Sequence, residues 1–199
     1  MASRGPESRA NKDSSLVGIG MEKVPRSARQ LLRVMEEMPT FKMMHDRERT
    51  ELGEIADIVR CPGGTIIYED REEGEFVYFI IQGSVELRTR VGPGMAHTVR
   101  DFKDEGIVGL GVALGATEYH LQCYARDKTA ALRFKRSELQ RILRAGKPAA
   151  IKLFTAMGLE LGRQLRTATN EVVYMLEKTS MMPAKSIMGV DDDGLGGIL

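Results

Sequence analysis

The chain has 199 residues, of which 42% are hydrophobic and 29% charged, and its formal net charge is +1 at pH 7. This balance is typical of one globular domain with extensions. Because opposite charges nearly cancel, no overall field favours DNA or an anionic membrane as a partner. The N-terminus lacks the apolar core of a signal peptide, and no apolar run approaches the roughly 20 residues that cross a bilayer. We therefore expect a cytoplasmic protein without membrane insertion.

Residues that could carry metal or catalytic chemistry are few and scattered. Cys61 and Cys123 lie far apart, with neither a Cys-x-x-Cys pair nor a histidine at ligand spacing, so we expect two reduced, packed thiols and no metal. His45, His97 and His120 occur singly, and no nucleophile–base grouping accompanies them. The pattern predicts that the protein is not an enzyme and has no catalytic residues.

The N-terminal part divides into a lead and two helices. Residues 1–24 are rich in Ser, Arg, Asn, Asp and Gly, which favours a disordered lead. Helical periodicity begins at Pro25, and we assign residues 25–60 to N-terminal helices. The first helix should stop at Pro39, and the second should span about Asp46 to Ile58.

Residues 61–135 show the spacing of short strands. Phe76 to Ile81 is an uncharged apolar run, and Gln82-Gly83 forms a tight bend before the next strand. The remaining predicted strands are Thr65 to Tyr68, Ser84 to Arg90, Ala96 to Phe102, Tyr119 to Ala125 and Thr129 to Phe134, with a turn at 91–94. Many short strands at close spacing predict a β-sandwich or barrel and not a parallel sheet.

Residues 136–178 should be helical. Ser137 with Gln140 has the spacing of a capping box, Gly146 ends a short helix, and Pro148 opens a long one. Apolar residues recur along the long helix at three- and four-residue steps and should face either the strands or a second copy of the chain: Phe154, Met157, Leu161, Leu165, Ala168, Val172 and Met175. We expect a homodimer, another protein partner, or both, and a flexible tail at 179–199.

The order of elements and three stretches of sequence resemble the cyclic-nucleotide-binding domain, the sensor fold of CRP/FNR regulators and of cyclic-nucleotide-dependent kinases. The stretches are Gly64-Thr-Ile-Ile, the run from Gly74 to Leu87 that contains Tyr-Phe-Ile-Ile-Gln-Gly-Ser-Val, and Lys-Arg-Ser-Glu-Leu at 135–139. The resemblance covers about Phe41 to Arg166. It implies a mainly β fold with flanking helices: a double-stranded β-helix, or jelly roll, with N-terminal helices and a long C-terminal helix.

Ligand binding in the family that the chain resembles depends on a phosphate cassette. There, a glutamate after the cassette glycine contacts the ribose, and an arginine ahead of the next strand pairs with the cyclic phosphate. The resemblance places the cassette at 108–114, where Gly109 fits the glycine but Leu110 stands at the glutamate position. The arginine position falls on Tyr119 or Glu118, and neither can neutralise a phosphate.

Two expectations follow for the cassette. Losing two charged contacts to a desolvated anion, at about 2–5 kcal/mol each, argues against ordinary binding of cyclic AMP or GMP. Backbone N–H groups and neutral side chains could still hold a nucleotide-like anion; the candidate residues are Gly109, Leu110, Gly111, Val112, Ala113, Thr117, Tyr119 and His120. The other interpretation, which we favour, is a packed apolar turn with no ligand or cofactor.

Only about 30 residues follow Arg166, which is too few for the helix-turn-helix that CRP/FNR regulators append, so we expect no DNA partner. Two hypotheses remain. The first is a regulatory, non-enzymatic module that acts through protein–protein contacts. The second is a bacterial-type sensor that binds a nucleotide-like anion at the cassette and signals through its C-terminal helix.

Overall fold

The computed structural model describes residues 20–25, 27–90 and 95–181. Most of the predicted lead, the predicted turn at 91–94 and nearly all of the predicted tail lie outside these residues. The chain separates into two compact units, Met1–Gly158 and Leu159–Leu199, which are treated one at a time below.

The first unit contains two antiparallel sheets, as the jelly-roll prediction requires. One sheet has the strand order β1-β2-β9-β4-β7 and the other β3-β8-β5-β6. The bounds of the strands are β1 Glu22–Lys23, β2 Ala56–Cys61, β3 Ile66–Tyr68, β4 Phe76–Gln82, β5 Ser84–Arg90, β6 Ala96–Lys103, β7 Ile107–Val108, β8 Gln122–Ala125 and β9 Thr129–Lys135. The jelly-roll fold inferred from the sequence is confirmed.

Strand β4 explains why an uncharged run of residues lies in the middle of the chain. Its side chains alternate between two separate hydrophobic cores. Val77 and Phe79 point into a core shared with the helices, whereas Tyr78 and Ile80 point into the interior of the roll. Because both faces of this strand are buried, neither tolerates a charge.

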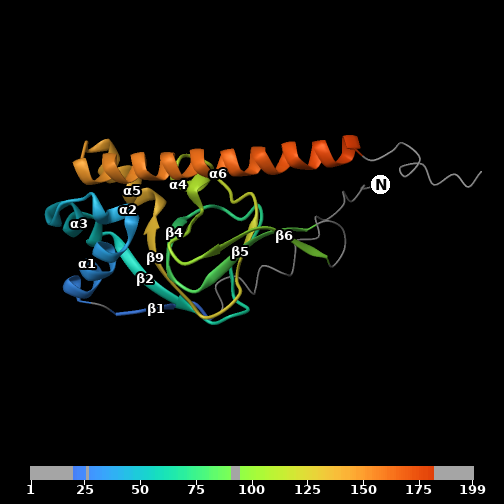
Figure 1. The fold of residues 1–199 in the computed structure, drawn as a ribbon. Helices are drawn as coiled ribbons and strands as arrows, with labels where there is room; N and C mark the ends of the chain where they lie inside the picture. The colour runs from blue at the N-terminus through green and yellow to red at the C-terminus, as the bar shows by residue number, and fades with distance from the viewer. Residues whose placement is uncertain (1–19, 26, 91–94, 182–199) are drawn as a thin grey trace, which may run out of the picture. The chain divides into compact units, whose positions relative to one another are not determined.

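Most of the helices gather at one end of the strands (Figure 1). They are α1 Ala28–Glu37, α2 Pro39–Lys42, α3 Asp46–Gly53, α5 Arg136–Arg144 and the first residues of α6 Pro148–Met181. Three phenylalanine rings form the centre of the helix-side core, with centroids of Phe41 and Phe79 5.3 Å apart and those of Phe79 and Phe134 5.5 Å apart. Buried apolar area of this kind is the main stabilising term for the fold.

Two local predictions were wrong. The helix expected to reach Ile58 ends at Gly53, and Ala56–Cys61 forms strand β2, because all six of these residues pair with β9. The tertiary pairing overrides the helical spacing of Ile55, Ala56 and Ile58. Helix α5 begins at Arg136 without a side-chain cap, since the Arg136 N–H donates to the Glu75 carbonyl oxygen at 2.8 Å; no Ser137 capping box forms.

Helix α6 belongs to both units. Met157 is fully buried in the helix-side core of the first unit, and Phe154 packs against that core. These two members of the predicted partner stripe are therefore accounted for by packing within the chain. The described part of the second unit is the helix from Leu159 to Met181 alone.

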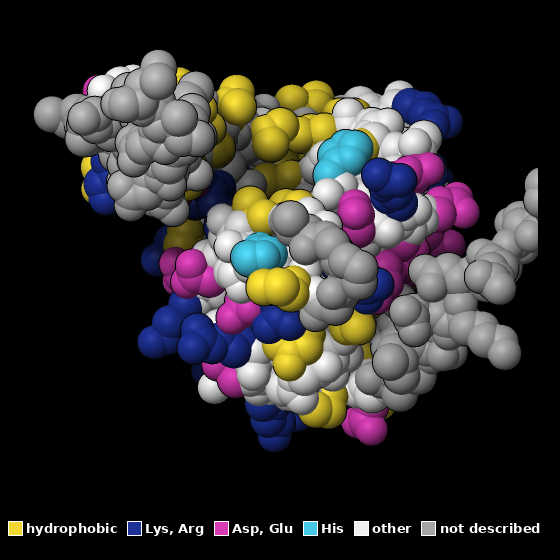
Figure 2. All heavy atoms as spheres, turned by 90° about the vertical axis from the view of Figure 1, so that its right-hand side faces the viewer, with side chains coloured by type: hydrophobic (Ala, Val, Ile, Leu, Met, Phe, Trp, Pro, Cys, Tyr) yellow, Lys and Arg dark blue, Asp and Glu magenta, His cyan; other side chains and the backbone are white. Residues whose placement is uncertain are grey.

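The surface carries mixed charge, as the net charge of +1 suggested. On the face that Figure 2 shows, Lys and Arg side chains are interspersed with Asp and Glu and with apolar side chains. This view shows no single-sign field of the kind that marks a nucleic-acid or anionic membrane surface.

Candidate functional site

The predicted cassette is a tight turn that leaves β7. Gly109 adopts a left-handed conformation with φ of 78°, and helix α4, Leu110–Ala113, follows it. A Cβ atom at Gly109 would lie 2.9 Å from the Phe76 carbonyl oxygen and 3.3 Å from the Tyr119 ring. Only glycine combines this φ with so close an approach.

The candidate ligand residues of the cassette do not face one space. Leu110 and Ala113 are buried in the helix-side core, whereas Val112 and Tyr119 are buried in the interior of the roll. Gly111, Thr117 and His120 are exposed, and Gly109 is half-buried. Their role in ligand binding stays a prediction.

Several backbone N–H groups of the cassette already have acceptors. Those of Val112 and Ala113 donate to the Gly109 carbonyl oxygen at 3.1 and 3.3 Å, and that of Ala116 donates to the Gly111 carbonyl oxygen at 2.8 Å. An incoming anion would have to compete with these bonds for the N–H groups of Val112, Ala113 and Ala116.

Tyr119 occupies one of the two positions where the family resemblance puts the arginine, the other being Glu118. The Tyr119 side chain is 4% exposed, and its ring stacks on Tyr68 with centroids 3.7 Å apart. Its hydroxyl donates to the Phe76 carbonyl oxygen at 2.8 Å and accepts from the Phe76 N–H at 3.1 Å. Burial raises the pKa of Tyr119 to about 12, so the phenol is neutral at physiological pH.

The loop between β3 and β4 is hydrogen-bonded through its backbone to the segment that contains Tyr119. The Arg71 N–H donates to the Tyr119 carbonyl oxygen at 2.8 Å. The Tyr119 N–H donates to the Glu72 carbonyl oxygen at 3.0 Å, and the Gly74 N–H donates to the Thr117 carbonyl oxygen at 2.8 Å. A Cβ atom at Gly74 would come within 2.2 Å of a Val112 methyl group. Loop and cassette are therefore packed against each other without spare room.

One residue that contacts the cassette was missed by sequence reasoning. A guanidinium N–H of Arg136, at the start of α5, donates to the Ala116 carbonyl oxygen at 3.2 Å. The only signal was its place within the Lys-Arg-Ser-Glu-Leu stretch, which resembles the entry to the family's short helix. The contact holds the end of the cassette in place.

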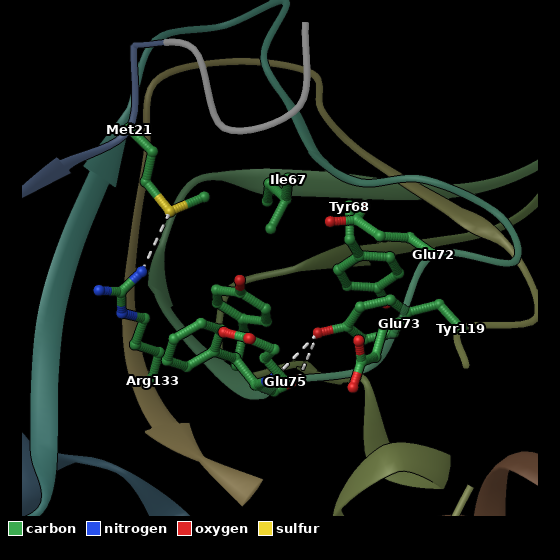
Figure 3. A pocket seen from close by; sticks show the side chains of 10 residues that line it. Met21, Ile67, Tyr68, Glu72, Glu73, Glu75, Tyr119 and Arg133 are labelled. Carbon is green, nitrogen blue, oxygen red and sulfur yellow. Dashed lines mark hydrogen bonds between the residues drawn. The ribbon is translucent and has the colours of Figure 1, made fainter. Parts of the chain in front are cut away.

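A cavity of about 220 Å³ is lined in part by Tyr119. Figure 3 shows Met21 and Arg133 on one side of it, Tyr68, Glu72, Glu73 and Tyr119 on the other, and Glu75 between them. Its lining is Met21, Ile67, Tyr68, Glu72, Glu73, Glu75, Phe76, Tyr78, Tyr119 and Arg133. Of the predicted cassette residues, Tyr119 alone belongs to this lining.

On the acidic side of the cavity, the pKa of Glu72 is raised. Burial raises the pKa of Glu72, and the nearby carboxyls of Glu69 and Glu75 raise it further, although a hydrogen bond from the Glu69 N–H opposes the shift. On the opposite side, Arg133 is held by contacts with Asp57 at 3.4 Å, with the Met21 sulfur at 3.9 Å and with the Phe76 ring at 4.4 Å.

Within the described ranges, no group of His, Cys, Asp or Glu side chains is placed to hold a metal ion. Cys61 and Cys123 are buried and unpaired, and burial raises the pKa of Cys61 to about 11. No helix among the described residues is both long and apolar enough to span a membrane.

The comparisons with known proteins agree with this geometry. Residues 58–145 match the family model described as the cyclic nucleotide-binding domain. No significant relative was found among curated proteins. Residues 58–145 are therefore similar to this domain, as the sequence motifs indicated.

Solved structures show the same fold. A cyclic nucleotide-binding domain from Methylobacillus flagellatus KT superposes with a TM-score of 0.68 at 13% identity, over 79% of this chain and 90% of that one. The sensor domain of the transcriptional regulator DNR from Pseudomonas aeruginosa gives 0.56 at 16% identity, over 70% and 93%. The regulatory subunit of a cAMP-independent protein kinase A from Trypanosoma cruzi, bound to guanosine, gives 0.54 at 17% identity, over 69% and 50%.

Proposed function

We propose that this protein is a regulatory, non-enzymatic module that acts through protein–protein contacts and does not bind cyclic AMP or GMP in the family's ordinary way. The observation that carries the proposal is Tyr119, which is 4% exposed and bonded through its hydroxyl to both backbone groups of Phe76. A side chain fixed in this manner is a structural part of the roll.

Electrostatics at the cassette support the first half of the proposal. A cyclic phosphate carries a full negative charge, and its removal from water must be offset by a paired cation. Leu110, at the glutamate position, is 4% exposed and packs in the helix-side core, and Tyr119 is a neutral phenol. Each missing charged contact costs about 2–5 kcal/mol, which turns micromolar affinity into millimolar or weaker.

The second unit supports the other half of the proposal. Within the part of it that the structure describes, one helix presents apolar side chains at alternating four- and three-residue steps, the spacing of a coiled-coil seam. Leu161, Leu165, Val172 and Met175 are between 41% and 67% exposed. We propose that this stripe, with Ala168, pairs with a second copy or with a helix of another protein.

Two measurements on the full chain test the proposal. Calorimetric titration with cyclic AMP and cyclic GMP at millimolar concentration should give no binding heat. Light scattering should give the mass of a dimer, which Leu165→Glu should reduce to that of a monomer. Asn170→Glu adds the same charge about half a turn away from the stripe and should leave the dimer intact. Micromolar binding of either nucleotide contradicts the first half; a monomeric wild type contradicts the homodimer.

The second candidate is a sensor of a nucleotide-like anion at residues 109–120 that signals through its C-terminal helix. The observation in its favour is the turn itself, since Gly109 keeps its left-handed conformation and helix α4 follows it. The neighbour from Trypanosoma cruzi, whose structure contains guanosine, makes uncharged nucleosides a useful probe. Binding of guanosine or a cyclic dinucleotide that is lost in Gly109→Ala would favour this candidate over the first.

A further inference from the structure

A short N-terminal segment, residues 20–24, lies along the outer edge of strand β2. Its two paired residues, Glu22 and Lys23, form β1, the terminal strand of the five-stranded sheet. The Val24 N–H adds a hydrogen bond to the Ile58 carbonyl oxygen at 2.8 Å. We call residues 20–24 the strap. Its backbone is attached at the edge of the sheet and not within it.

One side chain of the strap, Met21, covers part of the roll interior. Met21 packs against the buried cluster that contains Cys61, and it lines the cavity described above. Continued by one residue, the register of β1 and β2 places Met21 opposite Cys61. The Met21 sulfur lies 3.9 Å from the guanidinium of Arg133, as Figure 3 shows. The strap therefore separates this part of the interior from solvent.

An ion pair fastens the strap to the sheet. The Lys23 Nζ atom lies 2.5 Å from one carboxylate oxygen of Asp57, and the Arg133 guanidinium lies 3.4 Å from the other. The Lys23 side chain is 64% exposed, so this pair contributes no more than an ordinary surface ion pair does. The strap is thus held by a contact that a single substitution can remove.

The closed strap leaves one polar atom in an unfavourable environment. The Nε atom of Arg133 is buried and has no hydrogen-bond partner among the described residues. A buried donor without a partner costs free energy, and Met21 contacts this same guanidinium. Because lifting Met21 would let water reach the guanidinium, its hydration would offset part of the contacts that are lost on opening.

The neighbouring ladder is held far more firmly than the strap. Strand β2 pairs with β9 at six positions, whereas β1 pairs with β2 at two. Short edge segments of a fold open at lower free energy than its central ladders. The strap can therefore open without unfolding the sheet.

We propose that the strap is a conformational gate. Residues 20–24 detach from β2 as one unit and expose the cavity and the roll interior behind Met21, while β2 stays paired with β9. The ion pair between Lys23 and Asp57 sets the balance between the closed and the open form. This device uses neither the cassette nor the α6 stripe, so it goes beyond the proposed function.

Amide hydrogen exchange of the full-length protein, followed by NMR, tests whether the strap opens separately. The Val24 amide should be at least about 100-fold less protected than the central amides of the β2–β9 ladder. Lys23→Gln removes the ion pair and should accelerate exchange at Val24 about twofold to fivefold, with the ladder unchanged. Lys42→Gln, at an exposed lysine outside the strap, is the matched control and should leave exchange at Val24 unchanged.

The two native thiols report whether the roll interior opens with the strap. Cys61 is 3% exposed and Cys123 is 0% exposed, so each must be uncovered before a small maleimide reagent can reach it. Cys61 should be labelled before Cys123, because opening of the strap uncovers Cys61 alone. At the same pH, Lys23→Gln should speed labelling of Cys61 by the same twofold to fivefold, and Lys42→Gln should not.

Three results would overturn the proposal. The first is a Val24 amide as protected as the β2–β9 ladder. The second is an equal acceleration of the strap and the ladder in Lys23→Gln, which would mean that opening is global unfolding. The third is labelling of Cys61 no faster than that of Cys123. Binding of a cyclic nucleotide, or a monomeric mass, would contradict the proposed function and would leave the strap unaffected.

Discussion

Tyr119 and Tyr78 lie in the same roll interior and are equally buried, each 4% exposed, but their hydroxyls have opposite surroundings. The Tyr119 hydroxyl makes two hydrogen bonds with Phe76, in a region where loop and cassette touch without spare room. The Tyr78 hydroxyl makes no hydrogen bond with any described residue, although both tyrosines line the same cavity. Whether a side chain at the family's ligand position can bind a ligand therefore depends less on its residue type than on whether its polar atoms already have hydrogen-bond partners.

The largest expected effect comes from restoring the family's glutamate. Leu110→Glu would bury a carboxylate in the apolar helix-side core, and we expect the free energy of unfolding to fall by about 3 kcal/mol or more in urea denaturation. Gly111→Glu, at the exposed next position, should change it by less than about 1 kcal/mol. A Leu110→Glu protein as stable as the wild type would show that this part of the cassette can open.

A methyl group at Gly74 probes the contact between loop and cassette. Gly74→Ala should cost about 2 kcal/mol, because the new Cβ would meet a Val112 methyl group at 2.2 Å. Combined with Val112→Ala, which removes the clash, the loss should be smaller than the sum of the two single losses. Gly111→Ala, whose Cβ would meet its nearest neighbour at 3.6 Å, serves as the control and should cost nothing. Strict additivity in the double-mutant cycle would show that residues 74 and 112 are not in contact.

Replacing each tyrosine by phenylalanine tests whether the two hydroxyls differ in their hydrogen bonding. Tyr119→Phe should lower the free energy of unfolding by about 1.5 kcal/mol, since it deprives both backbone groups of Phe76 of a partner. Tyr78→Phe should change it by less than about 0.5 kcal/mol, because no hydrogen bond is lost. Equal losses of unfolding free energy in the two variants would mean that both hydroxyls have hydrogen-bond partners, and would contradict the difference between them.

The smallest effect concerns pH. Because the folded-state pKa of Glu72 lies above its unfolded value of about 4.3, the native protein binds this proton more tightly, and the contribution of Glu72 to stability falls as pH rises through that interval. Glu72→Gln should therefore raise the free energy of unfolding near neutral pH by less than about 1 kcal/mol and should give no gain below about pH 4.

Chemical denaturation at several pH values measures this difference. Glu86→Gln is an informative comparison, since a hydrogen bond from Arg88 lowers the pKa of the Glu86 carboxyl. Its contribution is present above the unfolded pKa and is lost as pH falls, so the variant should be destabilised near neutral pH and should approach the wild type in acid. If the stability change depended on pH with the same sign in both variants, the pKa of Glu72 would not be raised by its burial and its neighbouring carboxyls.

Parts of the fold and of the candidate site followed from local sequence. The alternation of Val85 and Leu87 with polar residues predicted a strand, and Pro148 correctly marked the start of α6. The left-handed turn at Gly109 could be placed because glycine there matched a motif. By contrast, Ala56 to Ile58 looked helical, and only pairing with a strand more than 65 residues away, β9, decided the conformation of this segment.

The jelly roll, the lack of charge at Leu110 and Tyr119, and the apolar stripe of the long helix could be predicted from the sequence, because each depends on residue type at a fixed spacing. Which polar groups find hydrogen-bond partners became clear only from the packed fold. The hydrogen bonds of Tyr119 to Phe76 join residues 43 positions apart, and the cavity beside Tyr78 is formed by several elements together. Sequence spacing cannot reveal such satisfaction, since a buried hydroxyl meets its partner or lacks one only when distant segments pack.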